Sequence, residues 1–241
     1  MQKVIFKDLG TISYREAWDY QQELLQQSID IKLKNRNLKE GHQPLLNVRH
    51  YLLFCQHPPV YTLGRSGSSD HLLLDEQGLQ KKGIEFFKIN RGGDITYHGP
   101  GQIVGYPIFD LDEFFTDVHR YVRYLEEAII RTLAEYGLEA MRIKEYTGVW
   151  LPQTNALPKR KICAIGVHLS RWVTMHGFAF NINTDLSYFN HIVPCGITDS
   201  DKTVTSLAIE LGRKVDEAEV KDKVKGHFAA LFGFEFAETF S

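Results

Sequence analysis

A cysteine stands between a proline and a glycine in the tripeptide Pro194-Cys195-Gly196. Proline fixes one backbone dihedral and glycine frees the next, so the chain can hold this thiol at a sharp bend. Such a bend can present a nucleophile, since the thiolate of cysteine is the reactive form. The alternative is a packed thiol, because free cysteine is among the most buried residue types. The turn makes Cys195 a candidate nucleophile.

A lysine begins a candidate strand in the segment Lys161-Ile162-Cys163-Ala164-Ile165-Gly166. Lys161 starts the apolar alternation, so its amine can point inward. A nearby cation lowers the pKa of a thiol, and a buried lysine can instead accept the thiol proton. The alternative is that Lys161 lies at the solvent-exposed end of a strand and has no catalytic role. Cys163 within this strand, and Cys55 in an earlier one, have the pattern of packed, structural thiols.

Four glycines lie between Arg91 and Gln102. They allow backbone to approach a ligand closely and expose N–H donors. The segment is neither a P-loop, since no Gly-Lys-Ser/Thr follows, nor a dinucleotide fingerprint, since no helix start follows at the required spacing. The alternative is a tight multiple turn between two strands, and the embedded Arg91, Tyr97 and His98 favour a site.

The ten histidines are scattered without the spacing of a zinc site. His168 and His176 flank a predicted hairpin and are expected to be surface or packed histidines. The sequence therefore predicts no metal site.

The elements expected around these residues alternate between strands and helices. Ser13-Tyr14-Arg15-Glu16 is typical of a capping box that begins a helix running to about Lys34. Helices are also expected from Asp117 to Gly137, over 204–211 and from Asp216 through Leu231. Strands are expected at 48–56, 60–63, 84–89, 103–109, 149–151, 162–169, 172–183 and 234–236, with a turn at Ser170-Arg171 and surface loops at 35–47 and 64–70. The pattern favours one α/β (α+β) domain over residues 1–241, with a mixed sheet flanked by helices.

Size and composition exclude several classes of protein. The 241 residues are 43% hydrophobic and carry a formal net charge of −2, which argues against a nucleic-acid-binding protein. A domain of this length buries enough surface to need no disulfide. Three cysteines without close pairing indicate reduced thiols and a cytoplasmic location. No stretch has the pattern of a signal peptide or approaches the ~18 apolar residues of a membrane span.

Taken together, these segments resemble the lipoyl(octanoyl) transferase family of lipoate biosynthesis. The matching motifs follow one order along the chain, at 57–65, 91–102, 161–166, 176–179, 181–183, 185–186, 189, 194–196 and 204–207. Residues 1–49 and the C-terminal tail are expected to add only compatible helices.

The resemblance implies a fold similar to the catalytic domain of biotin and lipoate protein ligases. It implies that Cys195 carries the acyl group, that Lys161 activates it, and that His57 and His98 lie near the thiol. It also implies an acyl-substrate pocket lined by Arg91, Gly92, Gly93, Asp94, Ile95, Thr96, Tyr97, His98, Ala164, Ile165, Gly166, Gly177, Phe178 and Ala179. Cys163 departs from the alanine or serine expected in the motif and adds a second thiol near the site.

The resemblance further implies octanoyl-acyl carrier protein as donor, with lipoyl domains of dehydrogenase E2 subunits and the glycine-cleavage H protein as acceptors. It implies no cofactor and no nucleic-acid or membrane partner. An ATP-dependent lipoate or biotin ligase is the first alternative, because the fold is expected to be shared. The Pro194-Cys195-Gly196 turn and residues 98–102 favour the transferase. Acyl transfer between two lipoyl-type proteins is the second alternative, and a non-catalytic binding module is the third.

Overall fold

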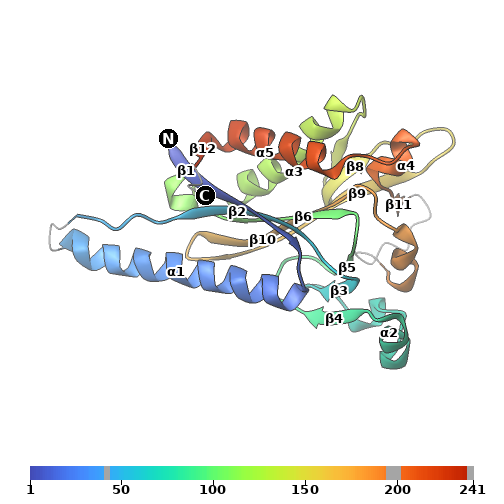
Figure 1. The fold of residues 1–241 in the computed structure, drawn as a ribbon, viewed down its shortest axis with the longest axis horizontal. Helices are drawn as coiled ribbons and strands as arrows, with labels where there is room; N and C mark the ends of the chain where they lie inside the picture. Colours follow the sequence, from blue (N-terminus) through green and yellow to red (C-terminus); the bar gives the residue numbers. More distant parts are fainter. Residues whose placement is uncertain (41–43, 194–201, 238–241) are drawn as a thin grey trace.

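A large mixed sheet forms the centre of the computed structural model, which describes residues 1–40, 44–193 and 202–237. Within these residues the sheet has nine strands (Figure 1). In spatial order eight of them are β12 (Phe234–Phe236), β1 (Gln2–Thr11), β2 (His50–Gln56), β6 (Gln102–Ile108), β10 (Val173–Asn181), β9 (Lys159–Ser170), β8 (Tyr146–Leu151) and β7 (Met141–Ile143). The ninth, β11 (Lys202–Val204), pairs in parallel with β9. The strands β12, β1 and β2 are parallel to one another, whereas the pairs from β2 to β7 are antiparallel. The predicted mixed sheet is confirmed.

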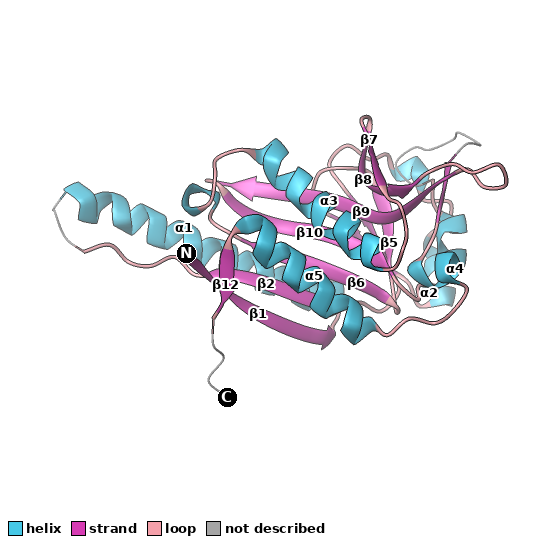
Figure 2. Ribbon diagram, turned by 90° about the horizontal axis from the view of Figure 1, so that it is seen from above, coloured by secondary structure: helices cyan, strands magenta, loops and turns pink. Residues whose placement is uncertain are grey.

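Helices cover both faces of this sheet (Figure 2). They are α1 (Tyr14–Glu40), α3 (Val118–Glu135), α4 (Leu207–Leu211) and α5 (Glu217–Phe232). A further helix, α2 (Glu76–Lys82), lies beside the smaller sheet described below. Successive side chains of a strand point to opposite faces, so in β2 Leu52 packs in the core under α3 and α5, whereas Leu53 packs in the core under α1. Figure 1 shows α3 and α5 on one side of the sheet and α1 on the other.

The helix ends follow the sequence signals. Ser13 Oγ accepts the Glu16 backbone N–H at 3.2 Å, and the Glu16 carboxylate accepts the Ser13 N–H at 3.3 Å, which confirms the capping box. The side chains of Asp117 and Asp216 cap α3 and α5 as predicted. The predicted hairpin is also confirmed, because β9 and β10 are antiparallel around residues 171–172.

Three predicted elements were wrong. The helix predicted to end near Lys34 continues to Glu40, because residues 35–40 are rich in helix-forming Arg, Lys and Leu. Residues 1–49 do not add only helices, since β1 pairs with β2 and β12. Residues 202–204 form β11, so the predicted helix over 204–211 begins only at Leu207, where Ser206 is the N-cap.

A smaller sheet lies beside the large one, in the order β4 (Glu85–Lys88), β3 (Val60–Leu63) and β5 (Ile95–His98). The strand β5 lies inside the glycine-rich segment, so the alternative of a multiple turn there was wrong. Tyr97 of β5 stacks on Tyr188, with ring centroids 4.7 Å apart. This stacking attaches the small sheet to the 3₁₀ helix at Leu186–His191.

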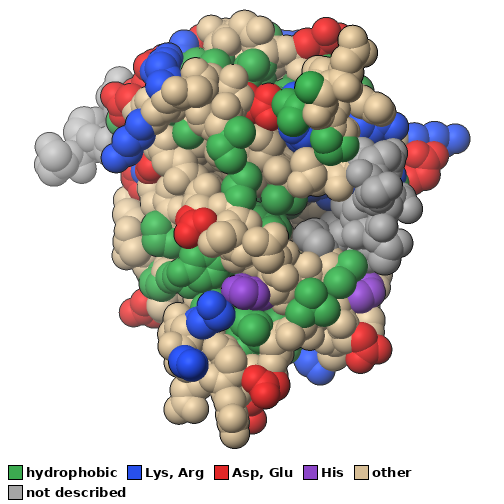
Figure 3. Space-filling view, turned by 90° about the vertical axis from the view of Figure 1, so that its right-hand side faces the viewer, with side chains coloured by type: hydrophobic (Ala, Val, Ile, Leu, Met, Phe, Trp, Pro, Cys, Tyr) green, Lys and Arg blue, Asp and Glu red, His purple; other side chains and the backbone are tan. Residues whose placement is uncertain are grey.

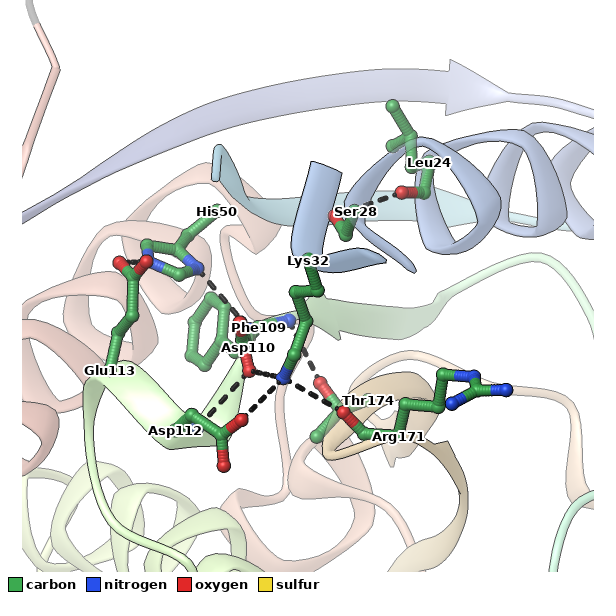
Figure 4. Close-up of polar contacts among 10 residues, drawn as sticks. All are labelled: Leu24, Ser28, Lys32, His50, Phe109, Asp110, Asp112, Glu113, Arg171 and Thr174. Carbon is green, nitrogen blue, oxygen red and sulfur yellow. Dashed lines mark hydrogen bonds and ion pairs between the residues drawn. The ribbon is translucent and has the colours of Figure 1, made fainter. Parts of the chain in front are cut away.

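A partly buried ion pair joins the long helix α1 to the sheet (Figure 4). Lys32 Nζ contacts the carboxylate of Asp110, lies 2.7 Å from Asp112 Oδ2, and donates to the Arg171 carbonyl at 2.8 Å. Asp110 is only 3% exposed, so the lysine neutralises a carboxylate that would otherwise be buried unpaired. Lys32 thus joins α1 to the end of β6 and to the tip of the β9–β10 hairpin.

Candidate functional site

A cavity lies between the two sheets and holds about 790 Å³, its mouth included. Its walls come from β5, β6, β9 and β10, and Tyr14 of α1 and Val204 of β11 contribute to them. It therefore lies toward the end of the molecule where Figure 1 shows β5 and β11. Viewed from that end, hydrophobic side chains occupy the middle of the face and charged ones lie mostly around them (Figure 3).

Most of the predicted site residues line this cavity. They are Lys161, Arg91, Gly93, Asp94, Ile95, Thr96, His98, Ala164, Ile165, Gly166, Gly177, Phe178 and Ala179. The strand register brings two of the predicted segments together, because Gly166 pairs with Gly177 and Ala164 with Ala179. Gly92 and Tyr97 lie outside the lining: Tyr97 packs in the small core described above, and the Gly92 N–H donates to the Val167 carbonyl at 3.0 Å.

The two paired glycines allow three segments of backbone to meet at this wall. A Cβ on Gly177 would lie 2.2 Å from the Gly105 carbonyl oxygen, and one on Gly166 would lie 2.7 Å from the Gly92 carbonyl oxygen. Real Cβ atoms essentially never come so close. Glycine at these positions therefore lets β6 and the glycine-rich segment pack directly on the β9–β10 hairpin.

Replacing Gly177 by alanine is expected to lower the free energy of unfolding by at least about 2 kcal/mol, because the new methyl group overlaps backbone that cannot move aside. Urea denaturation measures this change. The matched control is Gly226→Ala in α5, where a Cβ meets nothing within 4 Å. Alanine should be neutral or stabilising there, by up to about 1 kcal/mol. Equal effects of the two substitutions would contradict the close backbone contact at Gly177.

Lys161 lines the cavity and is buried, with 7% of its surface exposed. Its Nζ lies 4.7 Å from the centre of the Trp150 ring, a cation–π contact that positions the amine. Trp150 is the strand partner of Lys161 in β8, and on the other side the Thr205 N–H donates to the Lys161 carbonyl at 2.9 Å. The inward orientation predicted from the alternation is confirmed.

The β7–β8 hairpin that carries Trp150 is held by a buried carboxylate. Glu126 of α3 accepts hydrogen bonds from the Gly148 N–H at 3.1 Å and from Arg142 Nε at 3.0 Å. Arg123 Nη1 lies 2.6 Å from the same carboxylate. Two guanidinium groups therefore balance its charge, and the network fixes Thr147, which lines the cavity, as well as Trp150.

A chain of buried hydrogen bonds links β3 to β10 through the wall of the cavity. Arg91 Nη2 donates to Thr62 Oγ1 at 2.9 Å, and Thr62 Oγ1 lies 3.3 Å from His98 Nε2. His98 Nδ1 lies 2.9 Å from Gln102 Oε1, and Gln102 Nε2 donates to Asn181 Oδ1 at 2.9 Å. An amide oxygen only accepts, so His98 carries its proton on Nδ1. These contacts fix the orientation of the polar groups in the wall.

His57 lies behind the wall rather than in it. Its Nε2 is 2.7 Å from Tyr106 Oη and its Nδ1 is 2.8 Å from the Ile12 carbonyl. Burial lowers the pKa of His57 to about 4. The ring is therefore neutral at pH 7 and supports Tyr106, which lines the cavity.

Three buried histidines are expected to make the folded protein sensitive to acid. Burial lowers the pKa of His57 to about 4 and that of His176 to about 3, and it lowers the pKa of His98 well below the usual value. Below pH ~6.5 the unfolded chain binds protons at these residues and the folded chain does not, so the free energy of unfolding falls as the pH falls.

Between pH 7.5 and 5.5 the expected loss is about 1.4 kcal/mol for each of these three histidines. Urea denaturation at the two pH values measures it. His119, an exposed residue of α3, provides the control, because His119→Gln should leave the pH dependence unchanged. A free energy of unfolding that stays constant over this range would contradict the burial of neutral histidines.

The predicted nucleophile, Cys195, lies outside the described residues, but the chain on both sides of residues 194–201 is described. Before them, the Val193 N–H donates to the His71 carbonyl at 2.8 Å. His71 Nδ1 in turn lies 2.6 Å from Oδ2 of Asp94, which lines the cavity. After them, β11 pairs with Lys161 through Val204. Both flanks of this segment are therefore connected to residues of the cavity wall.

The other two cysteines are buried and free, as predicted. Burial raises the pKa of the Cys55 and Cys163 thiols. Both thiols are therefore protonated at neutral pH and poor nucleophiles.

Nine residues of the lining were not predicted as site residues. Five of them lie in the matching motifs without having been assigned to the pocket: Gln102, His176, Asn181, Phe189 and Val204. The other four lie outside every motif: Tyr14, Val104, Tyr106 and Thr147. Val104 and Tyr106 follow Gln102 at intervals of two, so strand alternation from this motif residue would have found them. Tyr14 and Thr147 reach the cavity only through tertiary packing, and no local pattern marks them.

Within residues 1–40, 44–193 and 202–237, no cluster of three or more His, Cys, Asp or Glu side chains is arranged to hold a metal ion. None of the helices described there is long and apolar enough to span a membrane.

Comparison with known proteins identifies the family. Residues 13–229 match the model of the lipoyl protein ligase A/B catalytic domain. The octanoyltransferase of Flavobacterium johnsoniae is 58% identical over 97% of this chain and 98% of its own length. That of Cytophaga hutchinsonii is 54% identical over 99% of this chain and 96% of its own. A bi-partite lipoate protein ligase from Thermoplasma acidophilum has a similar fold, with a TM-score of 0.69 and 17% identity over 99% of this chain and 87% of that one.

The chain therefore belongs to the lipoyl protein ligase A/B catalytic domain family. Within this family it is an acyltransferase of lipoate biosynthesis and protein lipoylation, with octanoyltransferases as its relatives. The predicted resemblance and the predicted fold class are confirmed.

Proposed function

We propose that this acyltransferase moves an octanoyl group from octanoyl-acyl carrier protein to a lysine of a lipoyl domain, through a thioester on Cys195. The observation that supports it best is that the buried Lys161 lines a cavity whose wall is largely apolar. Ala164, Ile165 and Phe178 of that wall suit an alkyl chain, and burial contributes ~0.8 kcal/mol per CH₂ group.

In the first step the Cys195 sulfur attacks the thioester carbonyl, and the bond to the carrier's sulfur breaks. Lys161 takes the thiol proton from Cys195 and returns it to the departing carrier thiol. In the second step the acceptor lysine nitrogen attacks the new thioester, and the bond to Cys195 breaks. Lys161 takes a proton from the amine and delivers it to the Cys195 sulfur. An amide replaces a thioester, so the transfer needs no ATP, and the two steps predict ping-pong kinetics.

For the acceptors we propose lipoyl domains of dehydrogenase E2 subunits and the glycine-cleavage H protein. The archaeal protein of similar fold belongs to a lipoylation system that pairs a bi-partite lipoate protein ligase with its E2 lipoyl domain, which supports this class of acceptor. We also propose that residues 1–241 form one catalytic domain, because β1 and β12 from opposite ends of the chain pair in one sheet. The free Cys55 and Cys163 fit a reducing compartment, and we propose the cytoplasm.

Intact-protein mass spectrometry after mixing the enzyme with octanoyl-acyl carrier protein tests the proposal. We expect one added octanoyl group, which an apo lipoyl domain then removes. Parallel reactions receive free octanoate and ATP in place of the carrier thioester. Modification of the lipoyl domain only in these reactions, with no adduct on the enzyme, would show a ligase instead.

A further inference from the structure

His176 has an unusual backbone for a residue inside a strand. It lies in β10 next to Gly177, and its φ is +60°, a left-handed value that few residues other than glycine adopt. The conformation is held by the His176 N–H, which donates to Gln21 Oε1 of α1 at 3.0 Å. Strained backbone of this kind persists only where the surrounding structure imposes it, and it is concentrated at functional sites.

The ring of His176 is buried with one polar atom unused. His176 is 1% exposed, and its Nε2 lies 3.0 Å from Asn90 Oδ1. An amide oxygen only accepts, so Nε2 carries the proton and Nδ1 keeps a lone pair. Among the described residues Nδ1 has no hydrogen-bond partner. Burial, with a smaller contribution from the Arg91 charge, lowers the His176 pKa to about 3, so Nδ1 remains an acceptor at neutral pH.

The register of the hairpin places His176 at one end of the predicted acyl wall. His176 lines the cavity and pairs with Val167, one position beyond the Gly166–Gly177 pair. Eight carbons in line extend about 9 Å, the length of roughly three strand residues. An octanoyl chain that lies along Ala164, Ile165 and Gly166 therefore ends beside His176.

We propose that His176 is a specificity-determining residue that gives the acyl cavity a polar end. The assignment rests on the function proposed above. An alkyl chain that extends to His176 leaves Nδ1 without a partner, whereas an acyl chain with a hydroxyl group at its far end donates a hydrogen bond to it. The cavity therefore admits an eight-carbon chain, discriminates against a longer apolar one, and accepts an ω-hydroxyacyl group of the same length as that longer chain.

Two acyl thioesters of acyl carrier protein test the proposal. They differ only in whether the acyl chain ends in a hydroxyl group, which can donate a hydrogen bond to His176 Nδ1. The 8-hydroxyoctanoyl and nonanoyl groups have the same number of chain atoms, with OH in one where the other has CH₃. For the wild-type enzyme we expect kcat/KM for lipoyl-domain modification to be about tenfold higher with the hydroxyacyl thioester. A buried acceptor that is left without a hydrogen-bond donor lowers kcat/KM by about that factor. Octanoyl thioester serves as the reference substrate.

Two variants distinguish the effect of losing the acceptor atom from the effect of changing the shape of the site. His176→Phe keeps a ring but has no acceptor, and it should remove the preference or reverse it in favour of nonanoyl. His176→Asn offers an amide oxygen and is better suited to the left-handed backbone, so it should keep part of the preference.

The results distinguish this assignment from the function on which it rests. If wild-type enzyme transfers octanoyl but does not prefer 8-hydroxyoctanoyl to nonanoyl, the polar end is refuted, whatever the variants do. The same holds if His176→Phe retains the wild-type preference. If wild-type enzyme transfers no acyl group from any carrier thioester, the proposed function itself is refuted.

Discussion

Replacement of Cys195 by alanine is expected to remove the acyl adduct and to lower octanoyl transfer by at least about 10³-fold, because loss of a covalent nucleophile leaves only binding and positioning. Intact mass spectrometry measures the adduct, and lipoyl-domain modification measures the transfer. The fold should be unaffected, since the strands β10 and β11 on either side of residues 194–201 have their own partners in the sheet.

Cys163→Ala is the matched control for this experiment. Cys163 is fully buried in β9, and burial raises the pKa of its thiol, so the thiol is protonated at neutral pH. Its removal should leave the adduct in place. An adduct that persists in Cys195→Ala and disappears in Cys163→Ala would move the covalent step to Cys163 and contradict the proposed mechanism.

The parts of the fold that sequence predicted well are those with strong local signals. The capping box at Ser13 and the N-caps at Asp117 and Asp216 begin three helices where expected. The strand β1 was missed because only Val4 of its residues is buried, so no alternation of polar and apolar residues marks it. Its strand conformation depends on pairing with β2 and β12, which no local pattern reveals.

In the candidate site, too, the sequence predicted which segments take part but not how their side chains pack against one another. The family resemblance implied that residues 164–166 and 177–179 line one pocket, and the hairpin register places them directly opposite one another. Motifs alone did not distinguish residues that line the cavity from those that support it. Tyr97 stacks on Tyr188 outside the lining, and His57 supports Tyr106 from behind. Such support depends on how the two sheets pack, which is set by residues far apart in the chain.

Lys161→Ala should slow both half-reactions by about 10²–10⁴-fold, the usual contribution of a positioned acid or base. Rapid-mixing experiments measure acylation of the enzyme by octanoyl-acyl carrier protein and, separately, discharge of the acyl-enzyme by a lipoyl domain. Lys159→Ala is the control, because Lys159 lies two residues earlier in the same strand and outside the cavity lining. Its effect on either step should be less than about threefold, because its charge lies farther from the cavity and is more strongly screened by salt.

Lys161→Arg separates two ways in which a cation can help a thiol. Arginine keeps a positive charge that can sit over the Trp150 ring, but it cannot accept a proton at accessible pH. If Lys161 only stabilises the Cys195 thiolate, the arginine variant should recover both steps. If Lys161 accepts the proton of the incoming amine, as we expect, arginine should recover acylation in part and leave discharge as slow as in Lys161→Ala, because only the second step requires a neutral nitrogen nucleophile. Wild-type rates for both steps in Lys161→Ala would exclude either role.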